Sequence, residues 1–378
     1  MTELDGSRYR LMVTVLAGAV SALTMTGAHA SKYNVELETI GVSPTTLEQA
    51  PPAFPNGKMR AGQEGWVRMN FVVGPQGRAL DPVIVDSSGG PLFERAALDA
   101  VSSWQFKSPA AGMVHANNTV EVRFESGGDS GRAGRDFLRR SRDIVSDLYY
   151  GKARKAREKV DMANEFGGWN LYESTMLALL NARVEAAESD APEELEYYRR
   201  ALAISGPTTL KRRNRLEILA RIFELEVDSR QYGEALVTLQ TLRAINGSDA
   251  ALADVDGKIR QLESSIDGGE PLAVAARIDS PCDCDEGRPL WAYTPARRDF
   301  SFAEVSGNVE GFEARCDNHR LSAQVATGTR WSLPADWGSC RIFVFGDDAA
   351  TFEFIEYHED PGGEDIGGSA VASSDVVD

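Results

Sequence analysis

The chain has 378 residues, of which 42% are apolar and 26% charged, so it is long enough for two or three folded domains and is not disordered throughout. Its 40 Lys and Arg residues are outnumbered by 57 Asp and Glu residues, and the formal net charge is −17. This balance argues against general nucleic-acid binding, which requires a basic surface.

The first thirty residues are typical of an export signal. Arg8 and Arg10 precede an apolar run over residues 11–20, and the small residues of Ala28-His29-Ala30 fit a signal-peptidase site. We expect cleavage between Ala30 and Ser31 and an exported, soluble mature chain. The alternative is an uncleaved segment that anchors the chain in a membrane, because the apolar stretch is borderline in length for a span.

Residues 51–125 predict a small α/β module, and residues 31–50 are expected to form a linker before it. Apolar and polar residues alternate over residues 67–73 and 119–125, as in strands with one buried face. A Gly-Pro-Gln-Gly turn leads into a second strand around residues 83–85. Apolar residues at helical spacing follow over residues 93–104. The pattern indicates a three-stranded sheet covered by one helix.

This segment resembles the C-terminal domain of TonB-family proteins, periplasmic modules that transmit inner-membrane energy to outer-membrane receptors. The resemblance depends on a set of short motifs in family order: Phe54-Pro55, Glu64-Gly65, Gln76-Gly77-Arg78, Ser87-Ser88-Gly89, and the helix and its exit from Phe93 to Pro109. It implies a periplasmic location, with inner-membrane anchoring as the alternative, and a protein partner, the periplasmic segment of an outer-membrane receptor.

The resemblance also implies binding by β-augmentation, in which a partner segment adds to an exposed edge strand through main-chain hydrogen bonds. That edge is expected to be formed by Thr119, Val120, Glu121, Val122, Arg123, Phe124 and Glu125. Phe54 and Pro55 are expected to flank the incoming segment, although Phe54 is equally suited to anchor the core. The alternating charges of the edge also fit a simpler role, protection against aggregation.

Two features of family transducers are missing from this sequence. The apolar segment before residue 31 contains no acidic residue or His to couple to a proton-driven motor, and no long Pro-rich spacer follows it. These differences argue against direct coupling to an inner-membrane motor. They favour an alternative, a soluble periplasmic scaffold or adaptor that uses a helical array over residues 132–267 for protein–protein interaction.

Residues 132–267 predict an all-α region of helical hairpins. Amphipathic stripes of ten to twenty residues follow one another, and Tyr150-Gly151-Lys152-Ala153 and Tyr232-Gly233-Glu234-Ala235 mark the starts of second helices at a spacing that fits about 41 residues per repeat. The spacing resembles a divergent tetratricopeptide-type array, and an irregular helical bundle is the alternative. Either arrangement typically presents a surface to a peptide or protein.

Residues 270–360 predict a small antiparallel β domain, made of short β-prone runs between Gly, Asn, Pro and Asp clusters. All four cysteines lie there, and export favours disulfides. We expect Cys316 to pair with Cys340, since both sit at strand edges, which leaves Cys282 with Cys284. A zinc site built from Cys282, Cys284, Cys316 and His319 is an alternative.

The sequence contains no recognisable catalytic motif, and we expect neither an enzyme nor a bound cofactor or metal. Acidic pairs occur mainly in turns or in residues 361–378, a Gly, Ser and Asp-rich tail that we expect to be disordered. The sequence as a whole therefore predicts a multidomain α+β binding protein.

Overall fold

A computed structural model describes residues 33–40, 44–88, 90–126, 132–246, 255–280 and 287–358. The predicted signal with its cleavage site at Ala30 and Ser31, the pair Cys282 and Cys284, and the acidic tail lie outside the described residues. The described parts form three packed units, which we call the N-terminal module (residues 33–126), the helical array (residues 135–267) and the sandwich (residues 272–357).

The N-terminal module is built around a four-stranded antiparallel sheet in the order β1-β6-β3-β4. Its elements are β1 (Tyr33–Ile40), β2 (Thr46–Glu48), α1 (Asn56–Ala61), β3 (Gly65–Val73), β4 (Ala79–Ser87), α2 (Pro91–Ser103), β5 (Gln105–Phe106) and β6 (His115–Ser126). The predicted strands and helix are present, but the sheet has a fourth strand, β1. The predicted linker over residues 31–50 is wrong, because this stretch contributes β1 and β2.

One face of this sheet carries the module's core. Phe71, Phe93, Val101 and Trp104 are buried together between the sheet and α2. Gly77 closes the β3–β4 turn at φ 78°, where its backbone lies against the carbonyl of Phe106, so a side chain there would collide with that oxygen. The small sheet β2-β5 extends this end of the module.

The helical array consists of three antiparallel hairpins and a final helix. Its elements are α3 (Arg135–Tyr149), α4 (Ala153–Phe166), α5 (Leu171–Glu188), α6 (Ala191–Thr209), α7 (Arg212–Asp228), α8 (Tyr232–Asn246) and α9 (Asp256–Asp267). Pairs α3–α4, α5–α6 and α7–α8 pack closely, and the predicted second-helix starts coincide with α4 and α8. A capping box between Asn170 and Glu173 begins α5.

The sandwich packs two four-stranded sheets, β11-β10-β13-β8 and β12-β9-β14-β7, around an aromatic core. Its elements are β7 (Leu272–Arg277), β8 (Leu290–Tyr293), β9 (Asp299–Ser306), β10 (Val309–Cys316), β11 (Arg320–Ala323), β12 (Trp331–Ser332), η2 (Ala335–Trp337), β13 (Cys340–Gly346) and β14 (Thr351–Tyr357). The predicted antiparallel sandwich is present, with β7 and β8 as additional strands. The multidomain α+β class is confirmed.

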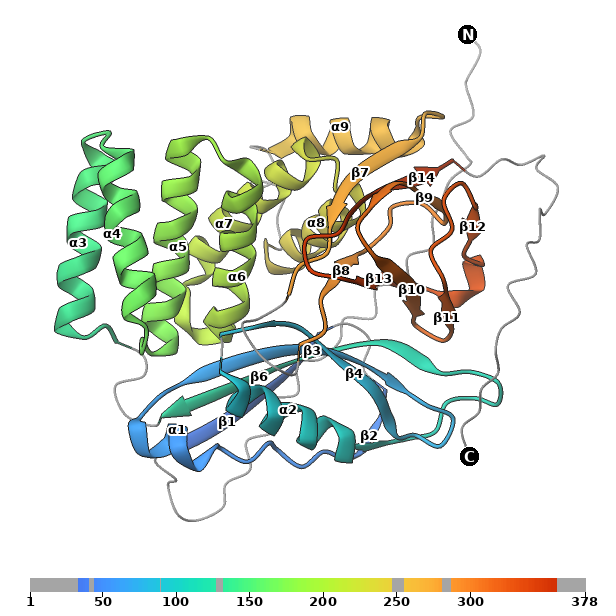
Figure 1. Ribbon diagram of the computed structural model, residues 1–378, viewed down its shortest axis with the longest axis horizontal. Coiled ribbons are helices and arrows are strands. Elements are labelled where there is room, and N and C mark those ends of the chain that lie inside the picture. The colour runs from blue at the N-terminus through green and yellow to red at the C-terminus, as the bar shows by residue number, and fades with distance from the viewer. Residues whose placement is uncertain are drawn as a thin grey trace, which may run out of the picture.

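The array and the sandwich lie side by side over the second face of the N-terminal sheet, opposite α1 and α2 (Figure 1). Trp66 on that face packs against Leu171, Ala203 and Ile204 of the array. On the same face, the Asn70 side chain accepts a hydrogen bond from the Arg315 guanidinium of the sandwich at 2.9 Å. Within the described ranges, no helix combines the length and apolar character needed to cross a bilayer.

Candidate functional site

The outer side of β6, where the sequence places partner binding, is occupied by the chain's own β1. The two strands pair antiparallel from Tyr33 opposite Ser126 to Ile40 opposite Thr119. On its other side β6 pairs with β3. The prediction that residues 119–125 form an exposed edge strand is therefore wrong, because alternation reveals which face of a strand is buried but not which strand lies beside it.

The apolar side of β1 closes the module's core. Val35 and Leu37 pack against the buried cluster beneath α2. The Tyr33 ring lies 5.1 Å from the ring of Phe54, and its hydroxyl donates to the Met59 carbonyl at 2.7 Å.

Phe54 combines the two roles considered for it. Its ring contacts Phe93 and Phe124 in the core at centroid distances of 5.8 and 5.7 Å, and it also touches Tyr33 of β1. Pro55 stands at the start of α1, where its carbonyl accepts the Met59 amide. Phe54 is thus a core residue that flanks the strand lying along β6.

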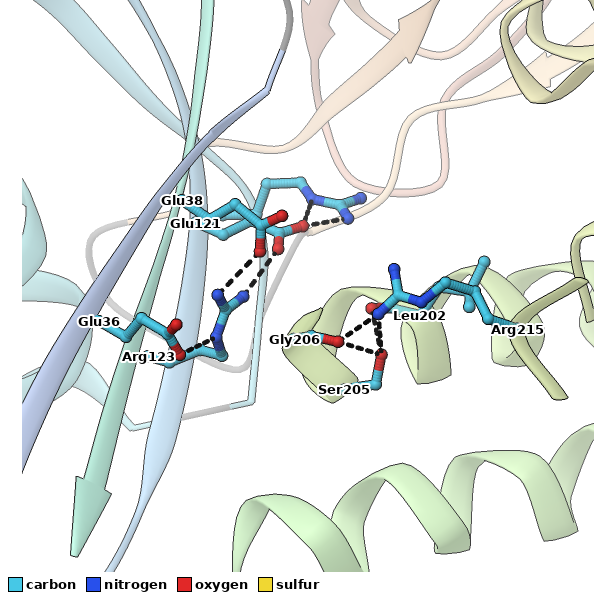
Figure 2. A network of polar contacts seen from close by, with 9 residues as sticks. Glu36, Glu38, Glu121, Arg123, Leu202, Ser205, Gly206 and Arg215 are labelled. Atoms are coloured by element: carbon cyan, nitrogen blue, oxygen red, sulfur yellow. Dashed lines mark hydrogen bonds and ion pairs between the residues drawn. The ribbon is translucent and has the colours of Figure 1, made fainter. Parts of the chain in front are cut away.

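The polar side of β1 supplies carboxylates to a buried arginine. Arg123 on β6 contacts Glu38 at 2.8 Å, Glu36 at 3.3 Å and Glu121 at 3.1 Å (Figure 2). The Arg123 side chain is 2% exposed, whereas Glu36 and Glu38 are 39% and 33% exposed. Two of the three carboxylates that neutralise this guanidinium therefore come from the edge strand.

Glu121 is shared between two arginines, because Arg68 on β3 also donates to it, at 2.9 Å from Nε. Burial opposes the charge of Arg123, but Glu121, Glu36 and Glu38 outweigh this effect and raise its pKa above the ordinary value. Without β1, one carboxylate would face two guanidinium groups.

The kink of α6 covers Arg123 from the side of the array. At the kink, Gly206 adopts φ 55° and ψ −171°. A Cβ at this position would lie 2.9 Å from Nε of Arg123. Arg215 donates to Ser205 and to the Gly206 carbonyl and thereby fixes the kink (Figure 2). Arg123 is thus enclosed between β1 and the backbone of α6.

The end of β6 is tied to the array by one carboxylate. Glu64 accepts hydrogen bonds from the Ser126 amide and hydroxyl at 2.9 and 2.7 Å, and from the Leu171 amide at the start of α5 at 2.8 Å. Glu125 lies close by, and burial, followed by repulsion from Glu36 and Glu64, raises its pKa.

The opposite edge of the sheet faces the sandwich. Val83 and Val85 of β4 pack against an apolar cluster formed by Leu290, Phe343 and Phe345. The Arg200 guanidinium of α6 donates to the Ser87 carbonyl at 2.8 Å. These contacts join the second half of β4 to the sandwich and to α6.

The sandwich contains the disulfide favoured by the sequence, between Cys316 and Cys340. Because Cys316 is oxidised, it cannot supply the thiolate that the alternative zinc site requires. His319 stacks on Trp337 at a centroid distance of 4.9 Å. Among the described residues, no group of His, Cys, Asp and Glu side chains has the arrangement of a metal site.

Two residues of the site, Glu36 and Glu38, are absent from the sequence prediction. The signal was present in the sequence, because Val35 and Leu37 alternate with these glutamates as in a half-buried strand. Of the predicted residues, Glu121 and Arg123 meet in the charged network, while Val120, Val122 and Phe124 point into the core and Thr119 and Glu125 lie opposite Ile40 and Asn34.

A family model described as "Gram-negative bacterial TonB protein C-terminal" matches residues 50–125. The solution NMR structure of the Pseudomonas aeruginosa TonB C-terminal domain is 24% identical, over 21% of this chain and 83% of that chain, with a TM-score of 0.19. No curated protein matches the chain. A domain of this family implies TonB-type energy transduction in general terms, with a protein partner and a location in the periplasm or on the inner membrane. Residues 50–125 thus match the C-terminal domain of the TonB family.

Proposed function

We propose that a partner segment binds this chain by replacing β1 along β6, and that the chain acts in this way as a periplasmic TonB-family binding protein in transport across the outer membrane. The partner is the periplasmic segment of an outer-membrane receptor, and the chain acts by binding rather than by catalysis. The family of residues 50–125 supports a protein partner.

One observation carries the proposal: β1 lies along the side of β6 where a β-augmenting segment would bind, and its side chains are only partly buried. None of its side chains from Tyr33 to Thr39 is fully buried, whereas β6 is buried continuously from Val120 to Phe124. Main-chain hydrogen bonds supply much of the affinity in β-augmentation, and any extended segment can make them. A second strand can therefore compete for the same side of β6.

A disulfide that locks β1 onto β6 tests this exchange. Asn34 lies opposite Glu125, and opposite Cβ atoms in an antiparallel pair are about 4.5–5.5 Å apart, within reach of a disulfide after a small shift. The probe is a fluorescent peptide with the sequence of residues 33–40, followed by anisotropy. We expect the oxidised Asn34→Cys/Glu125→Cys protein to lose binding and the reduced form to regain it.

The two single cysteine variants and the wild type, each oxidised and reduced, control for effects on the native disulfides. Equal binding by the locked and unlocked proteins would contradict exchange, because it would place the peptide on the outer side of β1 or elsewhere. In cells, a photo-crosslinker at Thr119, which lies opposite Ile40 of β1, should capture an outer-membrane receptor in the unlocked protein and lose it in the locked one.

The outer face of α3 favours a second candidate, a scaffold that uses the helical array. Leu138, Val145 and Tyr149 are exposed along one side of this first helix, and an open hollow lies between Arg142 and Tyr150. Under this function, the double variant Val145→Glu/Tyr149→Glu would abolish partner capture while the β1 lock leaves it unchanged. The opposite pattern would support exchange at β6.

A further inference from the structure

Resting on the proposed exchange of β1, we propose that Arg123 selects partner segments that carry two acidic side chains two residues apart, alternating with apolar side chains. The partner is thus an extended acidic segment with the pattern apolar-acidic-apolar-acidic. Residues 35–38 of this chain, Val-Glu-Leu-Glu, provide the internal template for that pattern.

The first step of the argument is the charge that β1 leaves behind. Arg123 is 2% exposed and has three carboxylate partners, of which Glu36 and Glu38 leave with β1. Glu121 remains, but it also receives Arg68. Of the carboxylates in direct contact with the two guanidinium groups, Glu121 alone then remains, and a buried charge without a partner is strongly unfavourable.

The second step is that Arg123 has little freedom to move toward the array. On the side of the array, its guanidinium lies against the backbone of Gly206, and even a methyl group added there would come within 2.9 Å of Nε. Arg215 hydrogen-bonds to the Gly206 carbonyl and holds that backbone in place. The carboxylates must therefore be brought to Arg123 by the strand that lies along β6.

The third step explains why apolar and acidic side chains must alternate in the segment that pairs with β6. Side chains on one side of a strand at β6 enter the core, as Val35 and Leu37 do, and those on the other side reach Arg123, as Glu36 and Glu38 do. A one-residue slip would turn the acidic side chains toward Phe54 and the apolar ones toward the arginines. Lys or Arg at the acidic positions would face Arg123 and Arg68 and be repelled.

Peptide binding to the full chain tests this selection. The chain carries Glu36→Gln and Glu38→Gln, so that its own β1 cannot neutralise Arg123 and competes less strongly. The acidic peptide has the sequence of residues 33–40, and a second peptide carries the same two Glu→Gln changes. The matched control appends two Glu residues after Ile40 of the second peptide, which restores its net charge but places the carboxylates beyond the positions that face Arg123.

We expect the acidic peptide to bind roughly tenfold or more tightly than either other peptide, because hydrogen bonds to charged groups contribute at least this factor. Equal binding of all three peptides, with continued sensitivity to the Asn34–Glu125 lock, would overturn the acidic selection while leaving exchange intact. If no peptide binds even to the variant with the weakened β1, the proposed exchange itself is wrong.

Discussion

The N-terminal module and the sandwich each bury a charged side chain, and they satisfy it by different means. In the module, Arg123 is neutralised by carboxylates, two of which come from the edge strand β1. In the sandwich, the fully buried Glu356 accepts the Tyr293 hydroxyl at 2.9 Å and the Arg297 amide at 2.6 Å, and both donors belong to the surrounding fold.

The difference between the two sites bears on the exchange that we propose for β1. Burial raises the pKa of Glu356 to about 7, so this carboxyl can become neutral and needs no opposite charge. An arginine cannot lose its proton in the same range, so Arg123 depends on acidic partners at every pH at which proteins fold. Because two of these acidic partners lie on β1, the neutralisation of Arg123 depends on which strand is paired with this side of β6.

The largest expected effect comes from removing the arginine. Arg123→Met leaves Glu121, Glu36 and Glu38 facing one another with Arg68 as their remaining partner, and we expect a loss of about 3–5 kcal/mol in the free energy of unfolding, measured with urea. Arg139→Met, which breaks an exposed pair with Asp136, is the control and should change stability by less than about 1 kcal/mol. Similar small losses for both variants would show that the network is not a buried one.

The second-largest expected effect is the pH dependence of the unfolding free energy that Glu356 causes, and it tests the contrast between Glu356 and Arg123. The folded-state pKa of Glu356 is about 7 and its ordinary value is 4.5, so the folded protein binds more protons between these values and becomes less stable as pH rises through this range. Glu356→Gln should remove this pH-dependent loss of stability, which reaches about 3 kcal/mol above pH 7. The measurement is the difference between wild-type and variant unfolding free energies from pH 4.5 to 8.

This difference isolates Glu356, because Glu226 and Asp86 also have raised pKa values, of about 7 and about 6, and contribute equally to both proteins. A difference that stays constant across the range would mean that Glu356 keeps its charge within the core, as Arg123 does. The contrast between the two sites would then disappear.

The smallest effect concerns the backbone behind Arg123. Gly206→Ala places a methyl group against the guanidinium at a positive φ, and we expect a loss of about 1–3 kcal/mol together with faster amide exchange in β1 and β6. Gly257→Ala in α9 is the control, since open space surrounds it and Ala favours helix, so it should be neutral or slightly stabilising. A tolerated Gly206→Ala would show that Arg123 can move.

The sequence predicted the parts of the fold that depend on local pattern. Alternation identified β3 and β6, and the stripe ending at Trp104 identified α2. The strand order was not predictable in this way, because the pairing of Tyr33–Ile40 with β6 joins residues about ninety positions apart. The charged site was only partly predictable for the same reason. Arg123 was among the predicted binding residues, but its partners Glu36 and Glu38 lie in a stretch that was interpreted as a linker.

The double attachment of Glu64 has a mechanical consequence. Its carboxylate holds the last residue of β6 and the first amide of α5 at the same time. Tension that arrives at the end of β6 therefore has a short, stiff route into the second hairpin of the array, through charge-assisted hydrogen bonds. Because of this shared carboxylate, we expect a pull on a strand paired with β6 to act on that hairpin as well as on the sheet.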